Sequence, residues 1–279
     1  MAIKLAFLEE AIELALFSAY LKGEAQAVSL LICAKAESKK SETVEKLKQM
    51  DSVLYLSDAT AYQVLKDYGD QISRRAIRHL VISDLIPSFS KRWETSSTFV
   101  AFLNELTAEG IVESRTYALP KKFAKPVKAG LIACITPPEL EDRRHKWVGA
   151  GFMSRVLPVS WSYAKDTVAE IFEYICLREY INEETVLPRL PRQDKTVILD
   201  PNLARLLLPY TYQYLSFWIE LSRAQGKAEA DLYGFRYQKS LQRLAMASAL
   251  QAGRDAVKEE DVERIAKLSR FLNLSYTQI

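Results

Sequence analysis

The chain has 279 residues, of which 49% are hydrophobic and 26% are charged, and its formal net charge is +3. These proportions are ordinary for a globular protein, and the length allows a core domain with a second lobe. No apolar run reaches the roughly 18 residues that span a bilayer. Glu9, Glu10 and Glu13 interrupt the apolar pattern near the N-terminus, so we expect neither a membrane segment nor a signal peptide. The small positive charge permits contact with nucleic acid without requiring it.

The cysteines indicate the compartment. Cys33, Cys134 and Cys176 are far apart in the sequence, and each lies in an apolar run. Such a sparse, odd set predicts buried thiols in a reducing compartment, and hence a cytoplasmic protein. Because the chain has only two histidines and no paired cysteines, we expect no structural zinc site.

Five apolar runs of strand length follow one another along the first part of the chain. They are nearly continuous rather than alternating, as expected for parallel strands that are covered on both faces. Helical patterns lie between them, for example at 95–109. The runs are 27–34, 52–57, 79–85, 130–136 and 155–161. Repeated strand–helix units predict a doubly wound α/β fold with a five-stranded parallel sheet.

The character of the sequence changes after about residue 180. The segment 183–200 contains Pro188 and Pro191 and is interpreted as a connection. Helices are predicted beyond it at 202–223, at 237–252, where Gly253 supplies a C-cap signal, and at 259–272. We therefore divide the chain into an α/β lobe, residues 1–180, and an all-helical lobe, residues 181–279.

The segment after the first apolar run could form a phosphate-binding loop. Such a loop needs a strand, a turn with converging backbone N–H groups and a helix start, and its usual pattern is G-x-x-x-x-G-K-[ST]. Residues 34–41 have the sequence AKAESKKS. Lys40 and Ser41 match the last two positions of the pattern, whereas Ala34 and Lys39 replace its two glycines. A solvated lysine-rich turn is the alternative, and only the position after the first buried strand favours a phosphate loop.

The end of the third run has the sequence Ile82-Ser83-Asp84-Leu85. A nucleotide hydrolase places an Asp here to hold the magnesium shell and usually a following Glu to activate water. Asp84 can fill the first role, but Leu85 cannot fill the second. In an alternative register, Ser83 takes the metal position and Asp84 the position of the base. A third interpretation is that Asp84 only caps the next turn.

Three more residues stand where nucleotide chemistry would use them. Thr136 ends the fourth run, where a polar side chain can hydrogen-bond the γ-phosphate or the attacking water. Arg155 precedes the fifth run, where an arginine can reach the nucleotide of a neighbouring subunit; a surface salt bridge is the alternative. Arg236 lies at the start of a predicted helix and could fold over a bound nucleotide.

These parts together resemble AAA+ ATPases, most of all the branch with minichromosome maintenance helicases and related phage or mobile-element replication proteins. Three stretches carry the resemblance. FLEEAIELALFSAYLKGE is similar to the helix that precedes the phosphate loop, GFMSR to the arginine-finger region, and FRYQKSLQRLAMASALQAGRDAVKEEDVERIAKL to the helical lid of that family. The resemblance covers nearly the whole chain in order and spacing. It is most specific in the lid and weakest in the phosphate loop.

The resemblance implies an α/β AAA+ P-loop core with a parallel five-stranded sheet, followed by a small all-helical lid. ATP and Mg²⁺ would be the cofactors, with Mg²⁺ held by Ser41 and Asp84. The implied roles are Walker A for Lys40 and Ser41, Walker B for Asp84, sensor 1 for Thr136, the arginine finger for Arg155 and sensor 2 for Arg236. Ala34 and Lys39 would line the loop in place of glycines, which crowds the turn.

A basic stretch just before the fourth run is a candidate for DNA contact. Replicative relatives place a basic hairpin near this point, directed toward the DNA channel. Lys121, Lys122, Lys125 and Lys128 surround one aromatic residue, Phe123, a combination that suits a phosphate backbone. The alternative is a soluble loop that Pro126 interrupts.

Two functions of different classes follow. The first is a replication-type protein, a helicase or helicase loader, that assembles with bound nucleotide on DNA as a ring or helical filament and meets other replication proteins. The second is a non-catalytic relative that keeps the fold and the oligomer surface and acts as a scaffold or adaptor. The replaced glycines and Leu85 speak against hydrolysis and so favour the second function. Some nucleotide binding is nevertheless favoured, because the chain keeps Lys40, Ser41, Asp84, Arg155 and Arg236 together.

Overall fold

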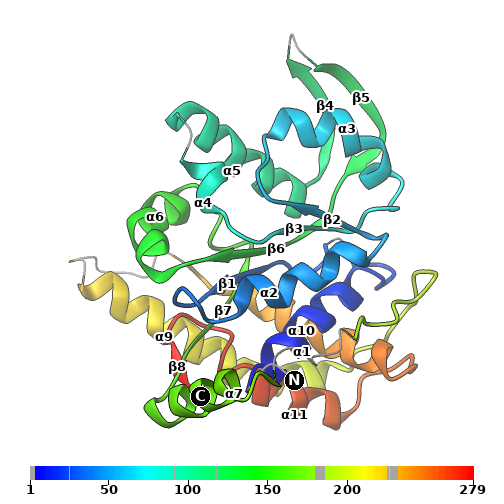
Figure 1. Ribbon diagram of the computed structural model, residues 1–279. Coiled ribbons are helices and arrows are strands. Elements are labelled where there is room, and N and C mark those ends of the chain that lie inside the picture. Colours follow the sequence, from blue (N-terminus) through cyan, green and yellow to red (C-terminus); the bar gives the residue numbers. More distant parts are fainter. Residues whose placement is uncertain are drawn as a thin grey trace.

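The central element is a six-stranded parallel sheet with helices around it, followed by a helical C-terminal region (Figure 1). The computed structural model describes residues 4–24, 26–90, 92–116, 119–179, 186–224, 226 and 232–279. The predicted domain boundary at 180/181 and the first residues of the predicted connection lie outside these ranges. Within the described ranges, no helix is long and apolar enough to cross a membrane.

The five predicted strands are confirmed, and all are parallel. The sheet order is β2-β3-β6-β1-β7-β8, an arrangement consistent with a P-loop-like fold. The prediction of five strands is wrong by one, because the two-residue strand β8 pairs with β7 at the sheet edge. Nothing in its short polar sequence distinguishes it from a tail. The strands are β1 Leu30–Cys33, β2 Val53–Leu56, β3 His79–Ile82, β6 Gly130–Ile135, β7 Leu157–Ser162 and β8 Thr277–Gln278.

The register of the strands places the candidate residues at one edge of the sheet. Cys33 pairs with Ile135 on one side and with Ser160 on the other, and Ile82 pairs with Ala133. The segments that follow β1, β3 and β6 therefore meet at the carboxyl edge, where open α/β sheets bind their ligands.

Helices cover both faces of the sheet (Figure 1). The first helix, α1, is buried along most of its length, because Leu8, Ile12 and Leu16 recur at helical spacing and face the core. The helices of the first two thirds are α1 Ala6–Ser18, α2 Lys40–Glu45, α3 Ala61–Ser73, α4 Ile86–Phe89, α5 Trp93–Thr107, α6 Pro137–Gly149 and α7 Lys165–Cys176, with the 3-10 helix η1 Lys46–Gln49 after α2.

A β-hairpin precedes β6 and lies at the end of the molecule opposite the C-terminal helices (Figure 1). It consists of β4 Ile111–Thr116 and β5 Leu119–Val127, which pair antiparallel. Phe123 fixes β5 against α3, because its buried ring occupies the space that a side chain at Gly69 would need. The basic stretch 121–128 is thus mostly one strand of a hairpin rather than a loop.

The C-terminal region contains α8 Pro201–Arg205, α9 Leu208–Ala224, α10 Phe235–Gln251 and α11 Glu259–Leu268. The single helix predicted at 202–223 is wrong, since the chain breaks between α8 and α9. Pro209, at the second position of α9, cannot continue a helix from the preceding turn. The helix α10 packs against α1 and α11, and the Arg264–Glu10 ion pair also joins this region to α1.

The cysteines follow the prediction only in part. Cys33 and Cys134 are buried in the sheet, but Cys176 is exposed. The prediction fails for Cys176 because α7 is not covered on its apolar side: of its described residues only Thr167 is fully buried. This uncovered face of α7 forms part of the candidate site.

Candidate nucleotide-binding site

The loop between β1 and α2 forms a turn that ends at the helix start. Lys39 is the N-cap of α2 and has a left-handed backbone, with φ of 61°, and Glu37 has φ of 62°. Ala34 is buried, its N–H donates to the carbonyl of Ile135 (3.4 Å), and its φ is outside the left-handed region. A glycine is therefore conformationally useful at position 39 but not at position 34.

Lys40 and Ser41 lie at the first turn of α2. The Lys40 ammonium is nearly buried and donates to the carbonyl of Lys35 (3.0 Å), so the loop wraps around it. The Ser41 hydroxyl donates to the carbonyl of Ser83 (3.2 Å), at the end of β3. The fold thus brings the end of the loop against the end of the third strand, as a phosphate and magnesium site requires.

The residues after β3 divide between this site and the core. Ser83 contacts Ser41, and the exposed carboxylate of Asp84 accepts from the N–H of Ile86 (2.9 Å). Leu85 is fully buried, and its N–H donates to the carbonyl of Cys134 (3.0 Å). Asp84 also caps the following turn, as the third interpretation states.

Thr136 is at the same edge, between β6 and α6. It is the N-cap of α6 and has an extended backbone, and its side chain makes no capping hydrogen bond. Thr136, Ser41 and Asp84 are therefore three oxygen-bearing side chains around the ends of adjacent strands. A hydroxyl and one carboxylate fit a Mg²⁺ ion that takes its other ligands from phosphates and water. Within the described ranges, no group of three or more His, Cys, Asp or Glu side chains could hold a metal ion by itself.

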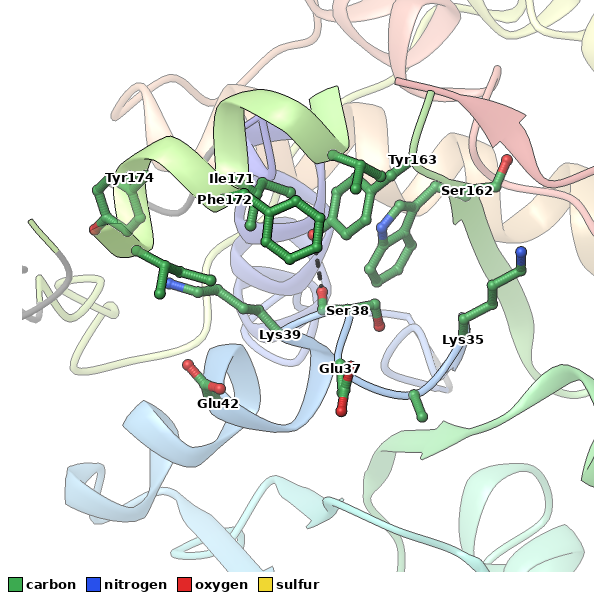
Figure 2. A pocket seen from close by; sticks show the side chains of 14 residues that line it. Lys35, Glu37, Ser38, Lys39, Glu42, Ser162, Tyr163, Ile171, Phe172 and Tyr174 are labelled. Atoms are coloured by element: carbon green, nitrogen blue, oxygen red, sulfur yellow. Dashed lines mark hydrogen bonds between the residues drawn. The ribbon is translucent and has the colours of Figure 1, made fainter. Parts of the chain in front are cut away.

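A cavity of about 440 Å³ lies between the loop and α7. Figure 2 shows α7 on one side of it and the loop with the start of α2 on the other. The Tyr163 hydroxyl closes the inner end by donating to the carbonyl of Ser38 (3.1 Å), and the Lys39 ammonium lies 5.3 Å from the centre of the Tyr174 ring. The α7 wall is mostly apolar and consists of Val168, Ile171, Phe172, Tyr174 and Ile175.

The two sides of this cavity differ in chemistry. The α7 side presents mostly apolar side chains, whereas the loop side carries Lys35 and Lys39 together with Glu37. The cavity therefore combines an apolar wall with a loop that carries charged side chains.

Arg155 and Arg236 do not lie at this edge. Both contact Glu109, at 3.4 Å and 3.7 Å, and Arg236 also donates to the Ser154 hydroxyl (3.0 Å). Burial lowers the pKa of Arg236, and the charge of Arg155 lowers it further. Arg155 donates in addition to the carbonyl of Gly151 (2.8 Å), so the salt-bridge alternative describes its contacts within the chain. Because β7 has six residues and rises about 3.3 Å per residue, about 20 Å of strand separates Arg155 from the carboxyl edge.

The four lysines of the basic stretch differ in their surroundings. Lys122 and Lys125 are exposed. Lys121 makes an ion pair with Asp70 (2.7 Å) and lies over the Phe123 ring. Lys128 is half-buried, and burial lowers its pKa while the nearby Glu109 raises it. Two of the four lysines are thus exposed, and the other two are partly buried.

The comparisons with known proteins identify no family. A scan against protein-family models finds no match to this chain. A search of the curated proteins finds no significant similarity. The fold and the geometry of the site therefore carry the functional argument.

Several residues of the site were not predicted from the sequence. Tyr163, Trp161 and the apolar side of α7 line the cavity. The positions 168, 171, 172 and 175 show the spacing of one helix face, so an amphipathic helix could have been found. The pattern does not reveal that this face borders a cavity rather than the core.

Lys39→Gly is expected to tighten nucleotide binding by up to about tenfold. Glycine keeps the left-handed backbone and removes the side chain that crowds the turn, so that phosphate oxygens can approach the backbone N–H groups more closely; 1.4 kcal/mol corresponds to about a factor of ten in affinity. Calorimetric titration of the variant measures the effect. Ala36→Gly is the matched control, because Ala36 is exposed in the same loop and its φ is not left-handed. An equal gain in both variants would contradict the role of this conformation.

Proposed function

We propose that this chain binds a nucleoside triphosphate at the loop 34–41 and associates head-to-tail, so that each nucleotide lies between two copies. The observation that carries the proposal is the cavity between the loop and α7, which has lysines on its loop side and mostly apolar side chains on its α7 side. The phosphates would lie at Lys40 and Ser41, near Asp84 and Thr136. The base would lie against Tyr163 and the apolar wall of α7.

The positions of Arg155 and Arg236 support the head-to-tail part of the proposal. Arg155 and Arg236 cannot reach the loop of their own chain, because they contact Glu109 beyond the opposite end of β7. Arg236 keeps 40% of its side chain exposed and is available to the phosphates of another copy. In this arrangement C-terminal helices act on the neighbouring copy's nucleotide rather than as a lid over their own.

Titration with ATP and with ADP in the presence of Mg²⁺, followed by measurement of phosphate release, tests the nucleotide part. We expect saturable binding of both nucleotides. Turnover would require a group other than Leu85 to activate water, and Asp84 is the nearest carboxylate in sequence. Absence of binding by the wild type and by Lys39→Gly would reject the proposal.

A scaffold without nucleotide is the second candidate, and Glu37 favours it. This exposed carboxylate stands within the loop itself, where its charge would repel phosphate, and the Lys40 ammonium already has the carbonyl of Lys35 as a partner. In that case Glu37 would meet the arginines of the next copy in place of a phosphate. The scaffold hypothesis predicts that the chain associates with itself without binding nucleotide.

Arg236→Ala is expected to weaken self-association at least tenfold, because it removes a charged contact to the next copy. Sedimentation velocity over a concentration series, with and without ATP, measures the change. Arg74→Ala, an exposed arginine at the end of α3, is the control and should associate as the wild type does. A wild-type chain that stays monomeric at tens of micromolar would contradict the head-to-tail proposal.

DNA is the proposed substrate of the assembly, and the hairpin β4–β5 is its contact. We expect Lys122→Ala/Lys125→Ala to reduce DNA affinity and its salt dependence more than Lys121→Ala/Lys128→Ala does, because the first pair is exposed and the second is partly engaged. Each lost phosphate contact should lower the salt slope by about 0.9 for a duplex. Fluorescence anisotropy over a salt series measures both. Lys239→Ala/Lys267→Ala in the helical region is the control, and an equal loss there would contradict the hairpin assignment.

A further inference from the structure

A second cavity, of about 230 Å³, lies at the amino ends of β1, β3 and β6, opposite the edge with the candidate nucleotide site. Its walls come from the end of α1, the segment between α3 and β3, and the segment between β5 and β6. It is smaller than the roughly 300–1,000 Å³ of pockets that hold drug-sized ligands. Its size therefore suits one small polar group with water rather than a nucleotide.

Four basic side chains line this cavity. The guanidinium groups of Arg75 and Arg78 share the single carboxylate of Asp194, at 3.3 Å and 2.6 Å. The ammonium groups of Lys125 and Lys128 make no hydrogen bond or ion pair with any residue that the structure describes. Because Lys128 is half-buried, its charge lacks a partner at a place where water compensates for it only in part.

The two carboxylates that line the cavity already have partners outside its walls. Glu24 accepts from Nε of Arg243 (2.6 Å), and Glu109 pairs with Arg155 and Arg236 (3.4 Å and 3.7 Å). Together with the shared carboxylate of the preceding pair, five arginines thus divide three carboxylates among them. The surroundings of the two lysines therefore keep an excess of positive charge.

Glu109 does not act as a full counter-ion for Lys128. Burial lowers the pKa of the Lys128 ammonium, the charge of Glu109 raises it, the charge of Arg243 lowers it, and the result lies below the ordinary value. A close ion pair would instead favour the charged form of the lysine. An anion in the cavity would supply the charge that is missing here.

Backbone hydrogen bonds hold the segment with the two lysines in place. The Ser73 hydroxyl oxygen accepts from the N–H of Lys125 (3.2 Å), and this hydroxyl donates to the carbonyl of Lys125 (2.6 Å). The N–H of Ala129 donates to the carbonyl of Leu106 (3.1 Å). The donors are therefore arranged before a ligand binds, which reduces the entropy that binding costs.

We propose that this cavity binds one phosphate group, held by Lys125 and Lys128 beside Arg75 and Arg78. A phosphate group offers negative charge and several acceptor oxygens to these donors. It comes from free inorganic phosphate or from the backbone of a nucleic acid. The site is separate from the nucleotide cavity, because it lies at the other end of the strands, and it depends neither on bound nucleotide nor on self-association.

Limited acetylation of lysines, measured by mass spectrometry, tests occupancy at this place in the chain. We expect inorganic phosphate to slow the acetylation of Lys128 severalfold relative to chloride at the same ionic strength. Lys66, an exposed lysine on α3, is the control and should react equally in both. The experiment uses Lys40→Met, so that phosphate at the loop 34–41 does not contribute.

Thermal unfolding over a phosphate series gives the affinity, because a ligand of the folded chain raises Tm. Added to Lys40→Met, Lys128→Met should weaken phosphate binding about tenfold, the usual scale for a hydrogen bond between charged groups. Lys128→Arg keeps the charge and should keep most of the affinity. Lys66→Met should bind phosphate as the parent does.

An oligonucleotide of deoxythymidine without terminal phosphates distinguishes the two sources. If it protects Lys128 and competes with inorganic phosphate, the group belongs to a nucleic-acid backbone. If only inorganic phosphate protects Lys128, the ligand is free phosphate, and both results support the site. If phosphate protects Lys128 no better than chloride does, or if Lys128→Met keeps the full rise in Tm, the site is wrong. A chain that fails to bind ATP at the loop would leave these results unchanged.

Discussion

Replacement of Lys40 by methionine is expected to weaken ATP binding by roughly 100-fold and to leave the fold intact. A hydrogen bond to a charged group contributes about 1.5–3 kcal/mol, and each 1.4 kcal/mol is about tenfold in affinity. Among the described residues Lys40 donates to one carbonyl, that of Lys35, so its loss should lower the free energy of unfolding by only about 1 kcal/mol. Methionine keeps the apolar stem of the side chain in its buried position.

Calorimetric titration and thermal unfolding of Lys40→Met measure the two effects separately. Lys48→Met is the matched control, because Lys48 is an exposed lysine beyond α2 that pairs with Glu45. The Lys48→Met variant should bind ATP with the same affinity as the wild type. If Lys40→Met binds ATP as tightly as the wild type, the loop does not hold the phosphates.

Gly130→Ala is expected to lower the free energy of unfolding by about 3 kcal/mol, because overpacking of a core costs about 1–3 kcal/mol and a displaced hydrogen bond about 1 kcal/mol more. Gly130 in β6 pairs with His79 in β3. A Cβ at position 130 would lie 2.3 Å from Nε2 of His79 and 3.1 Å from Cβ of Ala27. His79 is buried with Nε2 at 3.3 Å from the carbonyl of Val28, so its ring has nowhere to move without losing that contact. Burial lowers its pKa to about 4, and the ring is neutral at pH 7.

Chemical denaturation of Gly130→Ala measures this cost. Gly149→Ala is the control: nothing lies within 4 Å of a Cβ there, and its φ is not left-handed, so the change should be neutral or slightly stabilising. In the His79→Ala background the cost of Gly130→Ala should largely disappear. Equal stability of Gly130→Ala and the wild type would contradict the β3–β6 register that brings Ser83 and Thr136 to one edge.

The parts of the fold that local patterns encode could be predicted from the sequence. Continuous apolar runs located five parallel strands, and the helices α5, α10 and α11 follow from apolar spacing with capping residues. The sheet order could not be predicted, because parallel pairing joins segments as distant as Leu30 and Leu157. The strand β8 could not be predicted either, because the pairing of Thr277–Gln278 with β7 depends on where the chain lies after α11.

The candidate site shows the same division. The match of Lys40 and Ser41 to the phosphate-loop pattern pointed to the segment as a candidate, and the fold brings Ser41 to the end of β3. The burial of Leu85, the exposure of Cys176 and the contact of Arg155 with Glu109 depend on tertiary packing, which a single sequence does not specify. The left-handed backbone at Lys39 is hidden for the same reason, because lysine carries no signal for it.

Photolabelling with an azido-adenosine triphosphate, followed by mass spectrometry of the peptides, tests the central claim most directly. The claim is that the base lies between the loop and α7, so the label should appear within residues 161–175, be displaced by unlabelled ATP, and disappear in Lys40→Met. Labelling that ATP does not displace, or that falls on segments far from the cavity such as the β4–β5 hairpin, would contradict it.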